Sequence, residues 1–343
     1  GVIGKFPKRN VVLKKRKLDL LNLMQWHRKN VLFSRALKNC HKIGEGVYGE
    51  VFLWRARDGR ARVMKIVPVA GTTKVNGENQ KDFHEIISEI YIPICTFRTE
   101  RENRTIVLAV RCVYGSYTSR LLDLWELYDE CKGSENDNPA ILPTDQQYIV
   151  LELANAGQDL ESYQFNSAEQ AHVAIGLAVG EESFQFEHRD LHWGNVLIAP
   201  TEQKFATFVL RGRSHRVPRC GVAATIIDYS LSRLSLPLTA AGEAAALYND
   251  LAADDGLFDA VGDYQFEVYR LMRDKLGNDW KNFEPYTNIL WLHYTVDKMI
   301  TALRYKRTNT KIHKHYIAKL KAIKNRILSY GSAVQFVLTD NEY

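Results

Sequence analysis

The stretch FEHRDLHWGN, residues 186–195, carries more chemical information than any other part of the sequence. Its H-R-D-x-x-x-x-N spacing sets Asp190 and Asn195 five positions apart. Transfer of a phosphoryl group needs a carboxylate that orients the attacking hydroxyl and accepts its proton, and a second group on the same loop that holds a metal ion. Asp190 suits the first role and Asn195 the second. The alternative is a surface loop whose two histidines are incidental, and the rest of the chain decides between these interpretations.

Length and composition are those of a folded protein with two lobes or one large domain. The chain has 343 residues, 45% of them hydrophobic and 25% charged, against a typical domain of roughly 150 residues. No apolar run approaches the length of about 20 residues that a membrane span needs, and no signal-peptide pattern opens the chain. We expect a soluble, intracellular protein without membrane contact. Because residue 1 is Gly and not Met, we expect the catalytic piece of a longer protein.

The cysteines give no sign of a zinc site or a disulfide framework. They are scattered, with no C-x-x-C pair and no Cys/His spacing typical of zinc. We expect reduced thiols in a nuclear or cytosolic protein. The five cysteines are Cys40, Cys95, Cys112, Cys131 and Cys220.

Charge is distributed unevenly along the chain. Residues 1–42 hold 12 Lys/Arg and one acid, and residues 298–326 hold 10 Lys/Arg and no acid. Between these ends, residues 43–297 hold 24 basic and 37 acidic residues. The acidic body suggests a basic substrate, and the basic ends suggest contact with nucleic acid or chromatin. The alternative for the ends is that they are solvated faces of terminal helices.

Two features of the first half fit nucleotide binding. Residues 42–52 read KIGEGVYGEVF, a G-x-G-x-x-G pattern whose glycines allow backbone amides to approach phosphates. Strand-like residues flank this pattern, which favours a strand-turn-strand lid over a dinucleotide-binding turn. Residues 61–67, ARVMKIV, form a predicted strand in which Lys65 needs a partner. A predicted helix over residues 80–92 offers Glu85 and Glu89 on one face.

Further elements follow in an order that completes the pattern. Residues 105–113 and 147–153 are predicted strands, and residues 154–157 have the character of a hinge. A predicted helix over residues 168–182 leads into the 186–195 loop. Asp228 ends an apolar strand 33 residues after Asn195, in the string IIDYSLSR, where a second metal-binding carboxylate is needed.

These signals together predict an α+β, bilobal protein-kinase-like fold of an atypical kind. The metal motif is DYS in place of DFG, and no A-P-E follows it. We expect a basic extension over residues 1–40 packed on the first lobe, the first lobe over 41–153 and the hinge over 154–158. The second lobe then covers 159–343 and ends in basic helices.

Four strings carry a more specific resemblance. FEHRDLHWGNVL, IIDYSLSRL, GDYQFEVYRLM and LWLHYTVDKM are similar to the haspin family of atypical protein kinases. The resemblance runs from about residue 42 to about residue 302. It implies a nuclear serine/threonine kinase that uses ATP and Mg²⁺ and works on mitotic chromosomes. Its substrate would be a threonine near the amino terminus of histone H-three. A monomer is expected.

The resemblance also implies roles for individual residues. The family spacing of 24 residues after the strand lysine selects Glu89 over Glu85. His192 stands where most kinases carry a lysine, and we expect it to orient the substrate. The predicted catalytic residues are Asp190, Lys65, Glu89 and His192, and the predicted metal ligands are Asn195 and Asp228. The predicted ATP-binding residues are Gly44, Gly46, Gly49, Val51, Lys65, Leu153, Ala154, Gly157 and Asp159. The predicted substrate-binding residues are Asp159, Glu161, Asp254, Asp255 and Asp263, the last with a rival role as a helix cap.

Two other functions are consistent with parts of the sequence. DYS and the missing A-P-E suggest a pseudokinase that binds nucleotide and acts as a chromatin scaffold, although Lys65, Asp190 and Asp228 are all present. A small-molecule kinase of the aminoglycoside or choline type also lacks A-P-E. The apolar, alanine-rich centre of residues 228–263 predicts a packed segment that needs no phosphorylation to become ordered.

Overall fold

The computed structural model describes residues 24–26, 39–56, 58–83, 85–86, 89–90, 107–168, 172–235 and 246–340. The chain divides into two compact units, with the boundary between Asn155 and Ala156. The predicted hinge over residues 154–158 spans this point. We describe each unit by itself.

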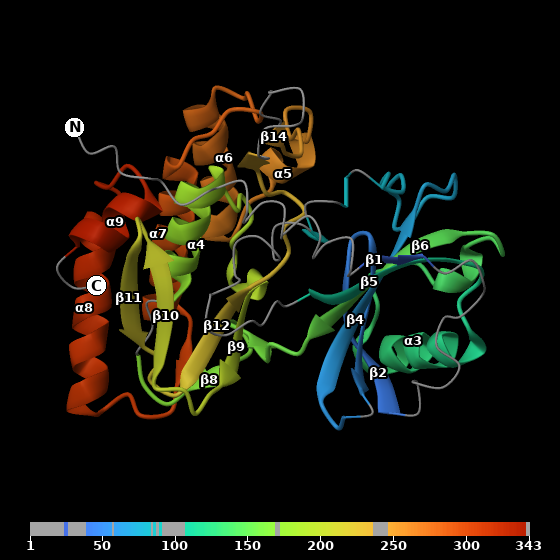
Figure 1. The fold of residues 1–343 in the computed structure, drawn as a ribbon, viewed down its shortest axis with the longest axis horizontal. Helices are drawn as coiled ribbons and strands as arrows, with labels where there is room; N and C mark the ends of the chain where they lie inside the picture. Colours follow the sequence, from blue (N-terminus) through green and yellow to red (C-terminus); the bar gives the residue numbers. More distant parts are fainter. Residues whose placement is uncertain are drawn as a thin grey trace, which may run out of the picture. The chain divides into compact units, whose positions relative to one another are not determined.

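Unit 1 is built on a six-stranded sheet with the order β1-β5-β6-β4-β3-β2 (Figure 1). Neighbouring strands are antiparallel except for β1, which pairs in parallel with β5. Of the predicted extension over residues 1–40, the structure describes β1 and the last two residues, and β1 attaches to this sheet. The strands are β1 (Met24–Trp26), β2 (Cys40–Gly46), β3 (Gly49–Arg55), β4 (Ala61–Val69), β5 (Val107–Tyr114) and β6 (Gln147–Ala154).

The alternation of side chains along β4 gives the sheet two apolar faces. Met64 and Ile66 belong to one buried cluster, and Val67 and Val69 belong to another. Because successive side chains of a strand point to opposite faces, Lys65 lies on the same face as Val67 and Val69. This face is covered by residues Ile86 and Ile90 of the segment that carries Glu89. The pleat of β4 therefore directs Lys65 toward its acidic partner.

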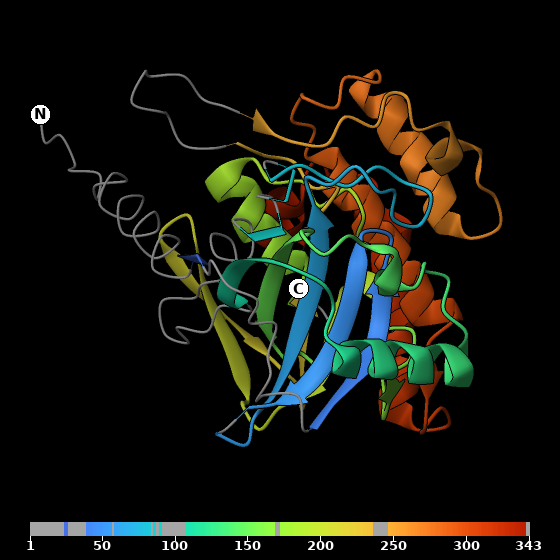
Figure 2. The ribbon, with the colours of Figure 1, turned by 90° about the vertical axis from the view of Figure 1, so that its right-hand side faces the viewer.

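Helix α3 (Ser119–Lys132) covers the other face and packs beside β2 (Figure 2). The hydroxyl of Thr118 caps its first turn by accepting from the backbone N–H of Leu121. Leu121, Leu124 and Trp125 are its buried residues. The chain then continues through a short 3₁₀ turn, Pro139–Ile141, before β6 begins.

The segment predicted as a helix over residues 80–92 begins later than expected. Lys81 still forms a bridge with Val69 of β4, and residues 89–90 are the described helical part. The side-chain oxygen of Gln80 accepts from the backbone N–H of Gly71, and its amide nitrogen donates to Gln146. These contacts keep Gln80 in an extended loop, which the apolar periodicity of the sequence does not reveal.

Unit 2 contains most of the helices and several small sheets (Figure 1). The central sheet has the order β12-β9-β7, and the β10–β11 ribbon lies beside α4. Its strands are β7 (Gln158–Asp159), β8 (Gln164–Phe165), β9 (Val196–Pro200), β10 (Phe205–Leu210), β11 (Arg213–Pro218), β12 (Val222–Ile226), β13 (Leu234–Ser235), β14 (Ala246–Leu247) and β15 (Arg304–Tyr305). Its helices are α4 (His172–Phe184), α5 (Asp255–Asp259), α6 (Tyr264–Leu276), α7 (Tyr286–Thr301), α8 (Lys311–Ile327) and α9 (Ala333–Thr339).

The basic carboxyl-terminal region forms the amphipathic helix α8. His313, Leu320, Ile323 and Ile327 are buried, whereas most of its lysines are exposed. Among the described residues, no helix has both the length and the apolar character needed to cross a membrane.

The alanine-rich centre of residues 228–263 is described only in part. Strand β14 pairs antiparallel with β13, which fixes the two ends of the segment to each other. Residues 236–245, on which the prediction of a packed centre depends, lie outside the described residues.

Candidate active site

In unit 1, the lysine of β4 forms an ion pair with the predicted glutamate. The Nζ of Lys65 lies 2.6 Å from an Oε of Glu89, and the Glu89 side chain is 7% exposed. Glu85 is used differently, because its carboxylate accepts from the backbone N–H of Asp82 at 2.6 Å. The geometry thus separates the two acids that the sequence left as alternatives.

The glycine-rich lid is the hairpin of β2 and β3, which turns between Gly46 and Gly49. Two asparagines from other loops hold its tip. The amide nitrogen of Asn136 donates to the Gly46 carbonyl at 3.1 Å, and that of Asn76 donates to the Val47 carbonyl at 2.7 Å. The lid is therefore ordered by unit 1 itself.

The base of this hairpin is fixed by a buried cation. The side chain of Lys42 is fully buried, contacts Glu45 and lies 3.0 Å from a carboxylate oxygen of Glu50. Its ammonium also lies 3.8 Å from the ring centroid of Tyr128 on α3. A buried lysine with two carboxylates and an aromatic face has the partners that burial of charge requires.

The three positions of the lid are occupied by glycine for different physical reasons. A Cβ on Gly49 would lie 2.2 Å from the carbonyl oxygen of Ile66, so this position needs glycine for close strand packing. A Cβ on Gly44 or Gly46 would meet nothing within 4 Å. The open space at these two positions suits a phosphate that approaches the backbone.

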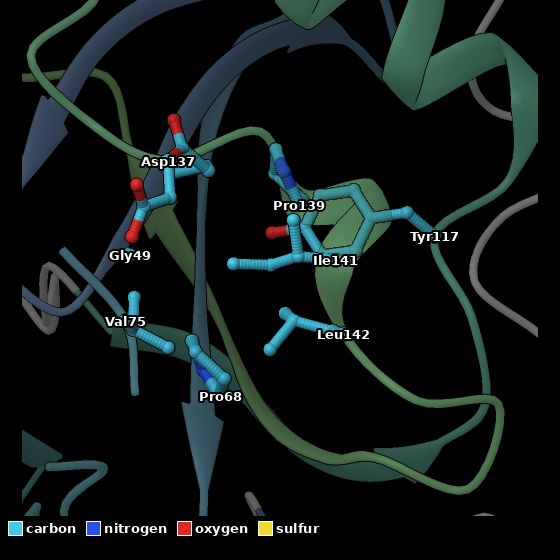
Figure 3. Close-up of a pocket in the computed structure, with 9 residues that line it drawn as sticks. Gly49, Pro68, Val75, Tyr117, Asp137, Pro139, Ile141 and Leu142 are labelled. Carbon is cyan, nitrogen blue, oxygen red and sulfur yellow. The ribbon is translucent and has the colours of Figure 1, made fainter. Parts of the chain in front are cut away.

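A small pocket lies behind the lid in unit 1 (Figure 3). Its lining is mostly apolar and includes Gly49 as the one predicted ATP-binding residue. Asp137, at its edge, exchanges hydrogen bonds with Asn76, whose side chain holds the tip of the lid. The lining residues are Gly49, Glu50, Pro68, Val75, Tyr117, Asp137, Pro139, Ile141 and Leu142.

Val51, Leu153 and Ala154, three further predicted nucleotide residues, lie on strands, and Gly157 precedes β7. Val51 of β3 pairs with Lys65, and Leu153 and Ala154 end β6 opposite Val63 and Arg62. In unit 2, Gly157 has a φ of +97°, and a Cβ there would lie 2.1 Å from the Ile198 carbonyl oxygen. This glycine is therefore needed for the chain itself to pass close to β9.

In unit 2, the catalytic loop brings Asp190 and Asn195 into contact. The amide nitrogen of Asn195 lies 2.8 Å from the Asp190 carbonyl oxygen and 3.2 Å from Oδ2 of the Asp190 carboxylate. The loop is closed by a short 3₁₀ turn, Trp193–Asn195, which His192 caps. Because the amide nitrogen faces Asp190, the amide oxygen is the atom of Asn195 that suits a metal ion.

The pairing of β9 with β12 brings Asp228 close to Asn195. Val196 pairs with Ile226, and the next rung is a hydrogen bond from Ile227 N–H to the Asn195 carbonyl at 3.0 Å. Asp228 then follows with a φ of +56°, in the left-handed region. Its carboxylate Oδ1 accepts from the backbone N–H of Ser230 at 3.1 Å.

Two carboxylates close together favour a divalent cation. Burial, and next the negative charge of Asp228, raise the pKa of Asp190 to about 8. The side-chain oxygens of Asn195 and Asp228, which lie beside Asp190, are ligands of the kind that Mg²⁺ prefers. When bound, Mg²⁺ supplies positive charge against nucleotide phosphates and relieves the repulsion that disfavours ionised Asp190.

The histidine of the HRD triplet connects the catalytic loop to the metal strand. His188 is fully buried, its Nε2 lies 3.1 Å from the Ile227 carbonyl and its Nδ1 accepts from Asp190 N–H at 3.3 Å. Burial lowers the pKa of His188 to about 4, so the ring is neutral at physiological pH. A neutral ring that donates from Nε2 satisfies both contacts.

His192 lies at the same site and contacts the loop through both ring nitrogens. Its Nδ1 accepts from Gly194 N–H at 3.1 Å, and its Nε2 lies 3.1 Å from the amide nitrogen of Asn195. Burial lowers the pKa of His192, which favours the neutral ring. Nε2 lies 3.9 Å from Oδ1 of Asp190, beyond hydrogen-bond distance.

A buried ion pair, absent from the predicted site, supports the loop. The guanidinium of Arg189 makes two hydrogen bonds to the Glu187 carboxylate, at 2.9 and 3.1 Å, and both side chains are fully buried. Arg189 also donates to the carbonyls of Trp280 and Asn282. Glu187 accepts from Thr287 Oγ1 at 2.8 Å. Four hydrogen bonds from the guanidinium thus fix Arg189, whose backbone has a φ of +65°.

Tyr269 is a second residue that the sequence reasoning missed. It lies on α6, and its hydroxyl donates to Oδ1 of Asp190. The string GDYQFEVYRLM that contains it served only to indicate the family. A contact between residues 79 positions apart has no local sequence signal.

The acids predicted to bind substrate differ in availability. Glu161 and Asp255 are exposed, and Asp254 is exposed but also caps α5 through Leu257 N–H at 3.1 Å. Asp159 accepts from Ser162 N–H at 2.7 Å. Asp263 caps α6 through Gln265 N–H at 3.0 Å and forms an ion pair with Lys298, so its carboxylate already has structural partners.

Comparison with known proteins agrees with this geometry. The family model described as haspin-like kinase domain matches residues 12–334. The chain belongs to the haspin-like kinase family. A "Serine/threonine-protein kinase haspin homolog" of Drosophila melanogaster is 43% identical over 314 residues, covering 87% of this chain and 54% of the relative.

Relatives from distant organisms show the same similarity. "Serine/threonine-protein kinase haspin" of Mus musculus is 38% identical over 89% of this chain and 42% of the relative. A haspin homolog of Arabidopsis thaliana is 36% identical over 93% of this chain and 54% of the relative. The chain spans about half the length of these curated relatives. The predicted membership of the haspin family is confirmed, and the strands of unit 1 and the helices of unit 2 agree with a kinase-like fold.

The glycines of the lid yield a first prediction. Gly49→Ala should destabilise the fold by more than about 1 kcal/mol, because its Cβ would strike the Ile66 backbone. Gly46→Ala meets open space and should leave the melting temperature nearly unchanged while raising KM for ATP. Thermal unfolding and ATP kinetics on both variants test this. Equal melting temperatures for the two variants would contradict the assignment.

Proposed function

We propose that this chain is an active serine/threonine protein kinase that transfers the γ-phosphate of ATP, with Mg²⁺, to a threonine near the amino terminus of histone H-three during mitosis. The contact between Asp190 and Asn195, with Asp228 directly after the last rung of the strand ladder, is the observation that carries the proposal. It supports catalytic competence because a base and an oxygen-donor metal site occur together. The ion pair of Lys65 with Glu89 adds the nucleotide-binding cation.

The residues divide the reaction between them. The Asp190 carboxylate accepts the hydroxyl proton of the substrate as its oxygen attacks the γ-phosphorus, and the bond from that phosphorus to the bridging oxygen of ADP breaks. Lys65, oriented by Glu89, neutralises the α- and β-phosphates. Asn195 and Asp228 would hold the metal ion, and His192 orients the substrate hydroxyl.

A basic peptide substrate fits the exposed acids. Glu161, Asp254 and Asp255 are exposed carboxylates that would attract the amino terminus and the Lys and Arg side chains of a histone tail. Asp159 is half-buried and is also one of the predicted ATP-binding residues. We leave Asp263 out of this surface because its cap and its pair with Lys298 already use the carboxylate.

We also propose that the enzyme is active without phosphorylation of its 228–263 segment. In many kinases the HRD arginine binds a phosphate that orders this segment. Here Arg189 is bound to Glu187 and to two carbonyls, and it is fully buried. Glu187 thus supplies permanently the negative charge that a phosphate would supply on demand.

The exposed cations near the carboxyl terminus support contact with chromatin. They belong to β15, to α8 and to the loop between them, and residues 298–326 contain no acid to balance them. We propose that they contact nucleic acid phosphates while the protein, a monomer, works on chromosomes in the nucleus. The exposed cations are Arg304, Lys306, Arg307, Lys311, Lys314 and Lys321.

The central test is turnover of labelled ATP with a histone tail peptide, with choline and an aminoglycoside as rival substrates. Peptide phosphorylation is expected, and Asp190→Asn should reduce kcat at least about 100-fold while ATP binding stays near normal. ATP binding without turnover in the parent protein would favour the pseudokinase scaffold. Phosphorylation of choline or the aminoglycoside would favour a small-molecule kinase.

The regulatory proposal predicts activity in the fully dephosphorylated enzyme. The domain is expressed in bacteria, treated with a phosphatase, checked by mass spectrometry and assayed on the histone peptide. Full activity is expected, because the Arg189–Glu187 pair needs no phosphate. Glu187→Gln should destabilise the fold by about 3 to 5 kcal/mol, since it leaves a buried charge unpaired. Activity that returns only after phosphorylation within residues 228–263 would show the proposal to be wrong.

The substrate surface predicts an effect on peptide binding alone. Asp254→Lys and Asp255→Lys should each raise KM for the peptide by about two- to fivefold at low salt, because exposed charge pairs contribute about 0 to 1 kcal/mol. KM for ATP should not change, and added salt should reduce the difference. Unchanged peptide KM in both variants at low salt would exclude this surface. Asp255→Lys is the cleaner variant, since Asp254 also caps α5.

A further inference from the structure

We infer that Tyr269 is a positioning residue that fixes the orientation of the catalytic carboxylate. Its hydroxyl donates to Oδ1 of Asp190 from the middle of α6, a helix that contributes no other predicted catalytic group. The inference rests on the proposed function, in which Asp190 accepts the substrate proton. It adds a residue whose action would be exerted through Asp190 and not on the substrate.

The two oxygens of the Asp190 carboxylate have different partners. Tyr269 occupies Oδ1, and Oδ2 lies 3.2 Å from the amide nitrogen of Asn195. The side-chain torsion that rotates an aspartate carboxylate has broad, roughly two-fold preferences. Packing alone therefore defines the plane of the carboxylate poorly. A donor fixed on Oδ1 sets the plane of the group. Oδ2 can then present a lone pair to the substrate hydroxyl in one direction, as proton transfer requires.

The tyrosine ring is itself held firmly. Tyr269 is 4% exposed, and its ring packs edge-on against Trp291 of α7 with centroids 5.3 Å apart. Trp291 is fully buried. At the start of α6, Asp263 caps the helix and pairs with Lys298 of α7. The Tyr269 hydroxyl is therefore held in place and can restrain the more flexible Asp190 carboxylate.

Other groups around Asp190 cannot replace this donor. His192 Nε2 lies 3.9 Å from Oδ1, beyond hydrogen-bond distance, and His188 interacts with the backbone N–H of Asp190 instead of its side chain. Burial, and next the charge of Asp190, raise the pKa of Tyr269 well above its usual range, so the hydroxyl keeps its proton and remains a donor.

The test is Tyr269→Phe, which removes the hydroxyl and keeps the ring. We expect kcat for peptide phosphorylation to fall about tenfold, while KM for ATP and the melting temperature change little. A tenfold loss corresponds to about 1.4 kcal/mol of transition-state stabilisation. The split between kcat and KM separates a positioning role from general damage to the fold.

Tyr264→Phe is the matched control. Tyr264 lies on the same helix, and its hydroxyl also makes a hydrogen bond to a side chain, to Nδ1 of His293 at 2.8 Å. It touches none of the proposed catalytic groups within the described structure, so its loss should leave kcat unchanged. Equal losses of kcat in the two variants would overturn the inference.

A double-mutant cycle with Asp190→Asn tests whether the effect passes through the base. If Tyr269 acts by orienting Asp190, adding Tyr269→Phe to Asp190→Asn should lower the residual rate by less than about twofold. A full tenfold further loss would show an independent role and overturn the inference. So would normal kcat in Tyr269→Phe, or loss of folding in that variant while Tyr264→Phe stays folded.

The possible outcomes separate failure of the positioning role from failure of the proposed kinase function. A parent enzyme that phosphorylates the peptide, together with an unaffected Tyr269→Phe variant, refutes the positioning role and leaves the kinase intact. A parent enzyme that phosphorylates no peptide refutes both, because there is then no base to position.

Discussion

The buried ion pair between Glu187 and Arg189 is the constraint on which the catalytic loop depends. Two full charges are removed from water in unit 2, which is tolerable only because each also bonds to backbone or hydroxyl groups around it. The pair ties the loop to residues 280–287 and holds Arg189 in a left-handed conformation. It thereby fixes the direction in which the next residue, Asp190, leaves the backbone.

Strand geometry is the second constraint on where the predicted site residues lie. In unit 2, one further rung of the β9–β12 ladder aligns Asn195 with the residue before Asp228, so two predicted metal ligands distant in sequence meet at one end of a sheet. In unit 1, the pleat of β4 places Lys65 on the face covered by the Glu89 segment. Both sites stand on rigid elements, which keeps charged side chains in place better than loops alone would.

Comparison of sequence and structure shows where local reasoning works. Lys65 and Glu89 were paired from a strand pattern and a family spacing, and the structure places them 2.6 Å apart. The family was also predicted correctly. The helix expected from Gln80 begins later, because the Gln80 side chain bonds to Gly71, nine residues earlier, and to Gln146, 66 residues later. Asp263 was expected at the substrate surface, yet its ion pair with Lys298 depends on two helices packing together.

The sequence by itself determined the kind of chemistry, because phosphoryl transfer needs particular residue types at short, fixed spacings: the HRD loop with Asn195, the glycines and the aspartate that ends a strand. Only the tertiary structure decided how those groups are held. The buried partner of Arg189 could be any of several acids until packing selected Glu187, and the hydroxyl on Asp190 comes from Tyr269, 79 residues away. The contact of Tyr269 with Asp190 joins residues whose separation along the chain carries no period or motif, so this pairing is a property of the packed core and not of any local pattern.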